Sequence, residues 1–250
     1  MEKLIGRALY QDRECFITPD ETDENFVFLL TGDFDQGFVK QKQRIQVKDI
    51  KFDLPFKPGK LFGIGKNYPS EETPNENINF FIMAHNALLA HASPLVLSRR
   101  IGSLIPEGEL AVVISKTIKD VSPFEAQDAI LGYTICNDYS AREINPADAP
   151  VAIKKSSDGL LPMGPYLLLD SSVREFEIRT FKNNELLQFG STTGMFNKIP
   201  ELISYISSFM TLNKFDLIST GTPGPKILAH RGDVVRVEIE GIGMLENAIV

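Results

Sequence analysis

PEGELAVVI, residues 106–114, joins two carboxylates to a short apolar run. The β-branched residues within Leu110–Ile114 predict a β-strand. Side chains two apart in an extended chain point to the same side, so Glu107 and Glu109 are expected on one face. Solvated strand edges often carry such a pair, and the pair alone therefore does not identify a functional site.

Further polar groups follow apolar segments downstream. In YTICNDYSARE, residues 133–143, Asp138 comes directly after an apolar strand, and Arg142 follows four residues later. Lys155 lies in KKSS, residues 154–157, within an otherwise apolar stretch. Thr222 lies in ISTGTPG, residues 218–224, which indicates a strand that runs into a rigid loop.

The segment between these motifs predicts a helix. Ser122 is expected as the N-cap, Pro123 at the first helical position and Glu125 as the second half of a capping box. We expect the helix to end near Gly132 and the next strand to cover Tyr133–Cys136.

The C-terminal half alternates strand and turn signals. Phe181–Glu185 (FKNNE) predicts a hairpin turn between two strands. Apolar residues at helical spacing predict a helix with one buried face; they are Ile199, Leu202, Ile203, Ile206 and Phe209 or Met210. Apolar and charged residues alternate farther on and predict a half-buried strand, whose apolar residues are Val235, Val237 and Ile239.

Strands dominate this pattern, helices are few, and their order is not a regular βαβ series. The sequence therefore predicts a mixed α/β protein (α+β) built on β-sheets. Residues 1–55 are interpreted as a small β-rich N-terminal module and residues 56–250 as the main domain. The Pro- and Gly-containing segment 52–60 is the expected linker.

Composition excludes some classes of partner. The chain has 250 residues and a formal net charge of −7, which argues against nucleic acid and anionic membranes as partners. Its two cysteines, Cys15 and Cys136, indicate reduced thiols and no disulfide framework. No signal peptide or membrane span is evident, so we expect a cytoplasmic protein.

Taken in order, the motifs resemble the fumarylacetoacetate hydrolase family. They are GxNY, ExELAVVI, GYTxxNDxSAR, KS, PxGPY, FMTLxxxDLISTGTPG and GDVVxVEIEGIGxLEN, and they run from about Gly63 to Val250. The resemblance implies a β-sheet roll, usually homodimeric, whose members hydrolyse C–C bonds of β-diketo acids or decarboxylate, tautomerise or hydrate related acids.

The resemblance also implies roles for individual residues. It makes Glu107, Glu109 and Asp138 the ligands of a divalent metal, usually Mg²⁺, with Mn²⁺ and Ca²⁺ as alternatives. It makes Lys155 the active-site lysine. Substrate-binding positions are Arg142, Thr222 and Tyr68.

Elementary chemistry agrees with these roles. Three adjacent carboxylates would repel one another unless some stayed protonated, and a hard cation with oxygen ligands removes that conflict. A 2-keto acid can chelate such an ion, which then stabilises an enolate. Lys155 would add positive charge near that oxyanion, and Arg142 would bind a distal carboxylate or form a structural ion pair.

The sequence departs from the family pattern in the segment GxNYxxHxxE, whose His–Glu dyad activates water. Here Glu71 stands at the His position and Pro74 at the Glu position. Glu71 would be a base if burial raised its pKa, or a solvated turn residue if not. The loop from Glu143 to Ile153 is also short, and the family's FxKP segment reads FIMA, residues 81–84, without its lysine.

We therefore predict a Mg²⁺-dependent enzyme that acts on a small anionic keto or enol acid through a metal-stabilised enolate. C–C bond hydrolysis, decarboxylation and tautomerisation all remain open. The alternative is a non-catalytic relative that binds a metal or metabolite and has lost the dyad.

Overall fold

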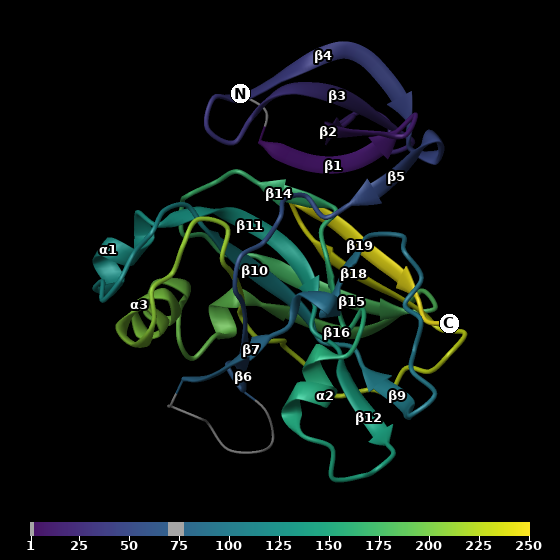
Figure 1. Ribbon diagram of the computed structural model, residues 1–250, viewed down its shortest axis with the longest axis vertical. Coiled ribbons are helices and arrows are strands. Elements are labelled where there is room, and N and C mark those ends of the chain that lie inside the picture. The colour runs from purple at the N-terminus through teal and green to yellow at the C-terminus, as the bar shows by residue number, and fades with distance from the viewer. Residues whose placement is uncertain (1–2, 70–77) are drawn as a thin grey trace.

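β-Strands make up most of the regular secondary structure, and in the part of the chain that the structure describes they form three sheets accompanied by helices (Figure 1). The structure is a computed structural model that describes residues 3–69 and 78–250. The expectation of a mixed α+β fold built on sheets is confirmed.

The largest sheet runs through the whole molecule, and within the described residues its main path is β4-β3-β2-β1-β14-β11-β10-β17-β6-β7. Its strands are β1 (Leu4–Tyr10), β2 (Arg13–Pro19), β3 (Phe26–Asp33), β4 (Gly37–Gln46), β5 (Ile50–Asp53), β6 (Leu61–Gly65), β7 (Asn79–Met83), β8 (Leu88–Ala90), β10 (Gly108–Ile114), β11 (Ile130–Asn137), β13 (Leu161–Met163), β14 (Tyr166–Leu168) and β17 (Leu217–Ser219). β5 pairs with β1, while β13 joins β11 to β8.

The N-terminal strands lie at one end of the molecule, at the top of Figure 1. Strands β1 to β5 of the N-terminal module pair with one another, and β1, which lies between β2 and β5, also pairs antiparallel with β14, with Leu4 opposite Leu168. Backbone hydrogen bonds therefore continue from the module into the main sheet. The division at residue 55 as a domain boundary stays a prediction.

Two smaller sheets complete the fold. One pairs β12 (Ser140–Ile144) with β9 (Ile101–Ile105), and the other has the order β16-β15-β18-β19. The strands of the second are β15 (Glu177–Lys182), β16 (Glu185–Ser191), β18 (Val234–Ile239) and β19 (Gly243–Ala248).

The four-stranded sheet packs directly on the start of β10. A Cβ atom built on Gly108 would lie 2.2 Å from Thr180 Oγ1 and 3.0 Å from a methyl group of Val237. Only glycine therefore fits between Glu107 and Glu109 at this separation of the two layers.

The structure confirms how the first helix begins but not where it ends. Ser122 and Glu125 form the capping box in front of α1 (Pro123–Gln127). The expected end near Gly132 is wrong, because β11 begins at Ile130, which pairs with Ile114 of β10. Pairing and burial in the central sheet outweigh the local helix signal there.

The predictions of the hairpin turn, the half-buried strand and the buried helix face are confirmed. Asn183 and Asn184 have φ angles of 50° and 69°, as a two-residue hairpin turn requires. Val235, Val237 and Ile239 are the buried residues of β18. Of the two residues expected at the end of the buried face of α3 (Ile199–Phe209), Met210 packs against the core, whereas Phe209 is exposed and stacks edge-on against Tyr205.

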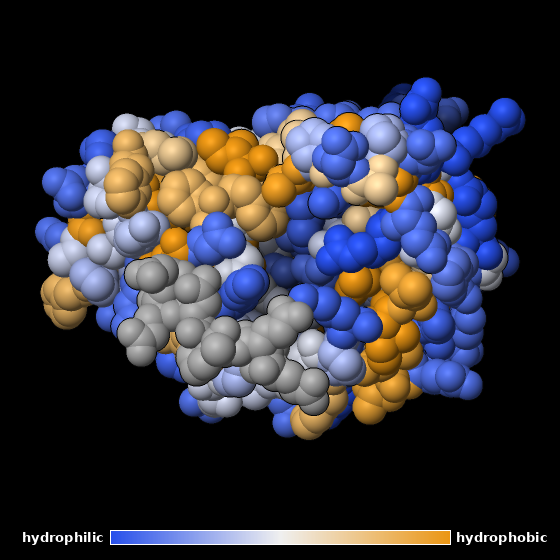
Figure 2. Space-filling model, turned by 90° about the horizontal axis from the view of Figure 1, so that it is seen from below, coloured by the Kyte–Doolittle hydropathy of each residue, from blue (hydrophilic) through white to orange (hydrophobic). Residues whose placement is uncertain are grey.

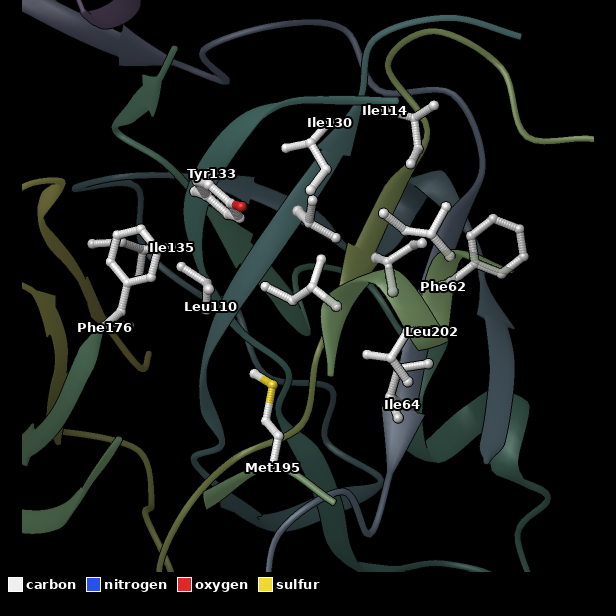
Figure 3. Close-up of a cluster of buried hydrophobic side chains, with 14 of the residues drawn as sticks. Phe62, Ile64, Leu110, Ile114, Ile130, Tyr133, Ile135, Phe176, Met195 and Leu202 are labelled. Atoms are coloured by element: carbon white, nitrogen blue, oxygen red, sulfur yellow. The ribbon is translucent and has the colours of Figure 1, made fainter. Parts of the chain in front are cut away.

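The largest hydrophobic core lies between α3, the central strands and the four-stranded sheet (Figure 3). Leu202 from α3, Leu110 from β10 and Ile135 from β11 belong to this core, and all three side chains are fully buried. Each such leucine or isoleucine contributes roughly 1.5–3 kcal/mol by leaving water. This packing holds rigid the two strands that carry the acidic residues.

The remaining helices are short: α2 (Val151–Ser156), in the lower part of Figure 1, and the single-turn 3₁₀ helices η1 (Val47–Asp49), η2 (His85–Ala87) and η3 (Thr192–Gly194). No helix among the described residues is long and apolar enough to cross a membrane.

Candidate metal centre and active site

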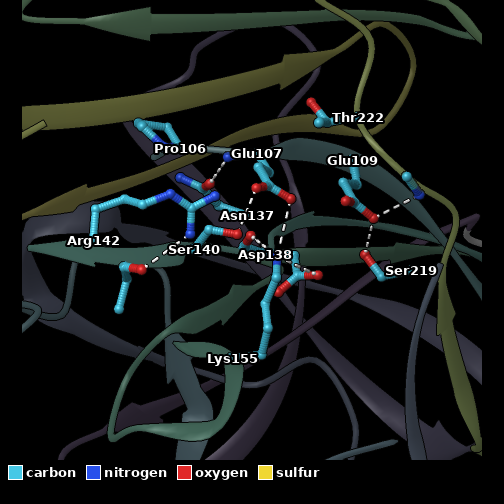
Figure 4. A network of polar contacts seen from close by, with 12 residues as sticks. Pro106, Glu107, Glu109, Asn137, Asp138, Ser140, Arg142, Lys155, Ser219 and Thr222 are labelled. Atoms are coloured by element: carbon cyan, nitrogen blue, oxygen red, sulfur yellow. Dashed lines mark hydrogen bonds and ion pairs between the residues drawn. The ribbon is translucent and has the colours of Figure 1, made fainter. Parts of the chain in front are cut away.

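The antiparallel pair β10–β11 brings the three acidic residues together. Gly108 lies opposite Asn137, so Glu107 just before β10 meets Asp138 just after β11, and the Asp138 amide donates to the Glu107 carbonyl at 2.9 Å. Carboxylate oxygens of Glu107, Glu109 and Asp138 lie within 4.8 Å of one another (Figure 4). The structure thus assembles the group that the sequence predicted, and this group could hold a metal ion.

Hydrogen bonds fix each of the two glutamates. Glu107 Oε1 accepts from Ser140 Oγ at 2.6 Å, and the Glu107 amide donates to Asn137 Oδ1. Glu109 Oε2 accepts from Ser219 Oγ at 2.6 Å and from the Gly221 amide at 2.8 Å. Ser219 reaches Glu109 because β17 pairs with β10 on the side away from β11.

Neither Ser140 nor Ser219 was predicted as a site residue, although they lie inside the motifs SAR and ISTGTPG. Ser140 follows Asp138 by two residues, which was an available signal, whereas Ser219 is distant in sequence from all three acidic residues. No spacing rule shows that a serine from another strand will point at a given carboxylate.

Lys155 extends from α2 into the centre of the acidic group. Its Nζ donates to Glu107 Oε2 and to the Asp138 carbonyl, both at 2.9 Å, and lies 3.1 Å from Asp138 Oδ2. An ammonium group has three hydrogens, so these protein oxygens occupy all of them. Lys154 is half-buried and has no such contact among the described residues.

Burial and charge shift the pKa values within this group. Burial raises the pKa of Asp138 to about 6, with Lys155 opposing the shift and Glu107 adding to it. Burial, followed by the charge of Asp138, raises the pKa of Glu109 well above its usual range. Burial would lower the pKa of Lys155, but Asp138 and the two glutamates raise it above its usual value, so this lysine is a cation and not a base.

The residues present fit a divalent cation. Asp138 Oδ1 is buried and has no hydrogen-bond partner among the described residues, which is costly for a carboxylate oxygen unless another group binds it. Three carboxylates and one ammonium carry a formal charge of −2 together, which a divalent ion would neutralise. An all-oxygen donor set of this kind suits Mg²⁺, Mn²⁺ or Ca²⁺.

Two of the predicted substrate-binding residues, Arg142 and Thr222, lie beside this group in Figure 4. Arg142 on β12 is half-buried, donates to the Ala141 carbonyl at 3.1 Å and forms no ion pair within the described ranges. Thr222 is half-buried in the loop after β17, and in the view of Figure 4 it lies on the Glu109 side while Arg142 lies on the Glu107 side.

Tyr68 packs against the loop after β17, which binds Glu109 through the Gly221 amide. Its ring approaches Gly221 and Gly194, and its buried hydroxyl has no partner in residues 3–69 and 78–250. Burial, and then the charge of Glu109, raises the pKa of Tyr68, so the phenol stays neutral and can donate a hydrogen bond.

Figure 2 shows the lower end of the molecule, where hydrophilic residues lie between hydrophobic surface patches. Phe81 contributes to the environment of Lys155, whose Nζ lies 5.6 Å from the centre of the ring.

Glu71 and Pro74, the residues at the positions of the family's dyad, lie outside the described residues. The role of Glu71 therefore stays a prediction.

Comparison with known proteins identifies relatives over most of the chain. The model of the fumarylacetoacetate (FAA) hydrolase C-terminal family matches residues 58–250. A 4-hydroxyphenylacetate degradation bifunctional isomerase/decarboxylase of Salmonella dublin is 40% identical over 77% of this chain and 47% of that protein. An uncharacterised protein of Pyrococcus abyssi is 40% identical over 83% of this chain and 96% of its own length.

Solved structures agree. The 2-hydroxyhepta-2,4-diene-1,7-dioate isomerase of Mycobacterium marinum superposes with a TM-score of 0.86 and 31% identity, covering 100% of this chain and 98% of that one. By contrast, the chain spans about half the length of the bifunctional isomerase/decarboxylases that it matches.

Proposed function

The chain belongs to the fumarylacetoacetate hydrolase family, and we propose that it is an enzyme that acts on a small keto or enol acid with a divalent cation, Mg²⁺ first, at Glu107, Glu109 and Asp138. The observation that carries the proposal is the convergence of these three carboxylates around the unpartnered Asp138 Oδ1. A structural ion-pair cluster would have no reason to leave this oxygen without a donor.

A 2-keto acid could chelate a cation held by these residues through its carboxylate and keto oxygens, and the cation would supply stabilisation of negative charge on the keto oxygen. Lys155 holds Glu107 and Asp138 in place and lowers the negative charge that an anionic substrate meets. We assign to Arg142 the substrate's distal carboxylate, because its guanidinium has no acidic partner among the described residues. Thr222 and Tyr68 supply neutral hydroxyl donors.

We favour tautomerisation or decarboxylation over C–C bond hydrolysis. Both reactions need stabilisation of an enolate but no activated water, and the chain has Glu71 and Pro74 where the family's water-activating His and Glu stand. The isomerase and isomerase/decarboxylase names of the relatives support the same choice.

Activity assays test this proposal. Purified protein with Mg²⁺ is expected to decarboxylate or tautomerise oxaloacetate or a related enol acid, and to lose that activity with a chelator. An acylpyruvate serves as the hydrolysis substrate in parallel. A protein that binds Mg²⁺ but converts none of these acids would instead be a non-catalytic metal- or metabolite-binding relative.

We also propose that the chain acts as a homodimer, by analogy with the family. Light scattering at several protein concentrations checks this, because a mass near the 27.9 kDa of one chain throughout would contradict it.

A further inference from the structure

Gln188, on β16 of the four-stranded sheet, is a buried amide that reaches out of its own sheet. It is 3% exposed and lies opposite Thr180 of β15. Its Nε2 donates to the Pro106 carbonyl at 3.2 Å and to the Pro225 carbonyl at 2.8 Å. An amide nitrogen has two hydrogens, so both are used for these carbonyls.

The two carbonyls belong to different parts of the proposed site. Pro106 directly precedes the metal-ligand candidate Glu107, and Pro225 follows Thr222 by three residues in the same loop. The amide oxygen of the same Gln188 lies 3.5 Å from Thr222 Oγ1. That distance is long for a hydrogen bond, so the hydroxyl can turn to a bound carboxylate at little cost.

The loop that carries Thr222 packs on the face of β16 from which the Gln188 side chain extends. A Cβ atom on Gly190 would lie 2.3 Å from Cβ of Pro223, so the absence of a side chain lets the proline ring approach. Gly224, at φ 108°, would place a Cβ atom 3.2 Å from Cβ of Gln188. Residues 188 and 190 share one face of the strand, and together they fix where the loop lies.

We propose that Gln188 is a positioning residue, which sets the spacing between the Glu107 side of the site and the Thr222 loop. The inference rests on the proposed function. Without its amide, the Pro106 and Pro225 carbonyls lose a buried donor, and the loop is no longer tied to the start of β10. The expected consequence is weaker binding of a substrate carboxylate that contacts both the cation and Thr222.

The chain offers a matched control. Asn247, on β19 of the same sheet, is also 3% exposed, and its Nδ2 also donates to two backbone carbonyls, those of Ala90 at 2.9 Å and Ser93 at 2.8 Å. Neither carbonyl adjoins a residue of the proposed site. Gln188→Met and Asn247→Leu therefore remove the same number of buried hydrogen bonds with little change in side-chain size.

Calorimetry with oxalate as the probe, on the Mg²⁺-loaded protein, measures the effect directly. We expect Gln188→Met to raise the Kd of oxalate about tenfold and to raise KM for a keto acid more than it lowers kcat, while Asn247→Leu leaves both constants near wild type. Both variants are expected to lower Tm by similar amounts. Mg²⁺ affinity without oxalate is measured alongside and should fall less than oxalate affinity.

The outcomes separate the two proposals. Equal oxalate affinity in wild type and Gln188→Met, with Tm lowered as in Asn247→Leu, would overturn the positioning role alone. Failure of the wild type to bind Mg²⁺ and oxalate would overturn the proposed function and this inference with it. If Gln188→Met does not fold, Gln188→Asn is measured instead, because it keeps a buried amide but shortens its reach by one methylene group.

Discussion

Replacing Glu109 by Gln should separate two properties of the acidic cluster. One is its affinity for a metal ion, and the other is the stability that its charge repulsion costs the metal-free protein. Glu109 is 1% exposed, and its Oε2 accepts hydrogen bonds from Ser219 Oγ and the Gly221 amide. A glutamine oxygen can accept both bonds, so Glu109→Gln removes one negative charge and keeps size and packing. The metal-free protein loses repulsion toward Asp138, and the metal-bound protein loses a charged ligand.

The sign of the stability change follows from the pKa shifts. Burial and Asp138 raise the pKa of Glu109 in the folded state, so the folded protein holds this proton more tightly than the unfolded chain. Stability of the metal-free wild type therefore falls as pH rises above the unfolded pKa of about 4.3. Glu109→Gln lacks this titration, and its advantage should grow from pH 4 to pH 8.

The general relation between pKa and free energy gives the scale of the effect. Each unit by which the fold raises the pKa of a carboxyl corresponds to about 1.4 kcal/mol. We expect a gain on the order of 1–3 kcal/mol for metal-free Glu109→Gln at pH 8, or several degrees in Tm for a chain of this size.

Thermal unfolding with a chelator at several pH values and calorimetric titration with Mg²⁺ measure the two effects. We expect Mg²⁺ affinity to fall by about 100-fold or more, since even partners outside the ligand shell are worth 10–100-fold. Glu240→Gln makes the same chemical change at an exposed position and should alter neither quantity. Unchanged Mg²⁺ affinity in Glu109→Gln would refute the site, and no pH-dependent gain in Tm would refute the repulsion argument.

Three further changes test neighbouring residues. Lys155→Met leaves Glu107 and Asp138 without their cation and should cost the metal-free fold about 3–5 kcal/mol near neutral pH, read as a fall in Tm; an equal fall in Lys154→Met would contradict the assignment. Ser219→Ala removes one donor to Glu109 and should weaken Mg²⁺ binding about 10-fold or more by calorimetry; unchanged affinity would show that the Gly221 amide suffices. Glu71→Gln should leave kcat unchanged, whereas a loss on the order of 10²-fold would identify Glu71 as a general base.

Local patterns in the sequence predicted the elements whose hydrogen bonds and packing are decided nearby. The Ser122 capping box needs only residues within one turn, and the Asn183-Asn184 turn needs only its own backbone angles. The end of α1 was mispredicted because Ile130 pairs with Ile114, a contact set by the tertiary sheet. Periodicity left Phe209 and Met210 as alternatives at the end of the buried helix face, and it did not show that Met210 would pack against the core while Phe209 stays exposed.

The acidic cluster was predictable because its members adjoin recognisable strands and match a known motif order. The residues that bind them were not, since Ser219 and Ser140 reach the two glutamates from other strands, and Gln188 binds the Pro106 carbonyl beside Glu107 from another sheet. Their roles depend on strand order and register across the sheets, which one sequence without its fold does not specify.

The antiparallel pairing of β1 with β14 has a consequence for how the protein can be divided. The region matched by the family model begins at residue 58, after the N-terminal strands, and a chain starting there would have Tyr166–Leu168 as an uncovered border. Exposed backbone donors and acceptors beside apolar side chains such as Leu167 are a template for pairing with other molecules. A chain shortened to residues 58–250 is therefore expected to aggregate, because it would lack the strand that pairs with this side of β14.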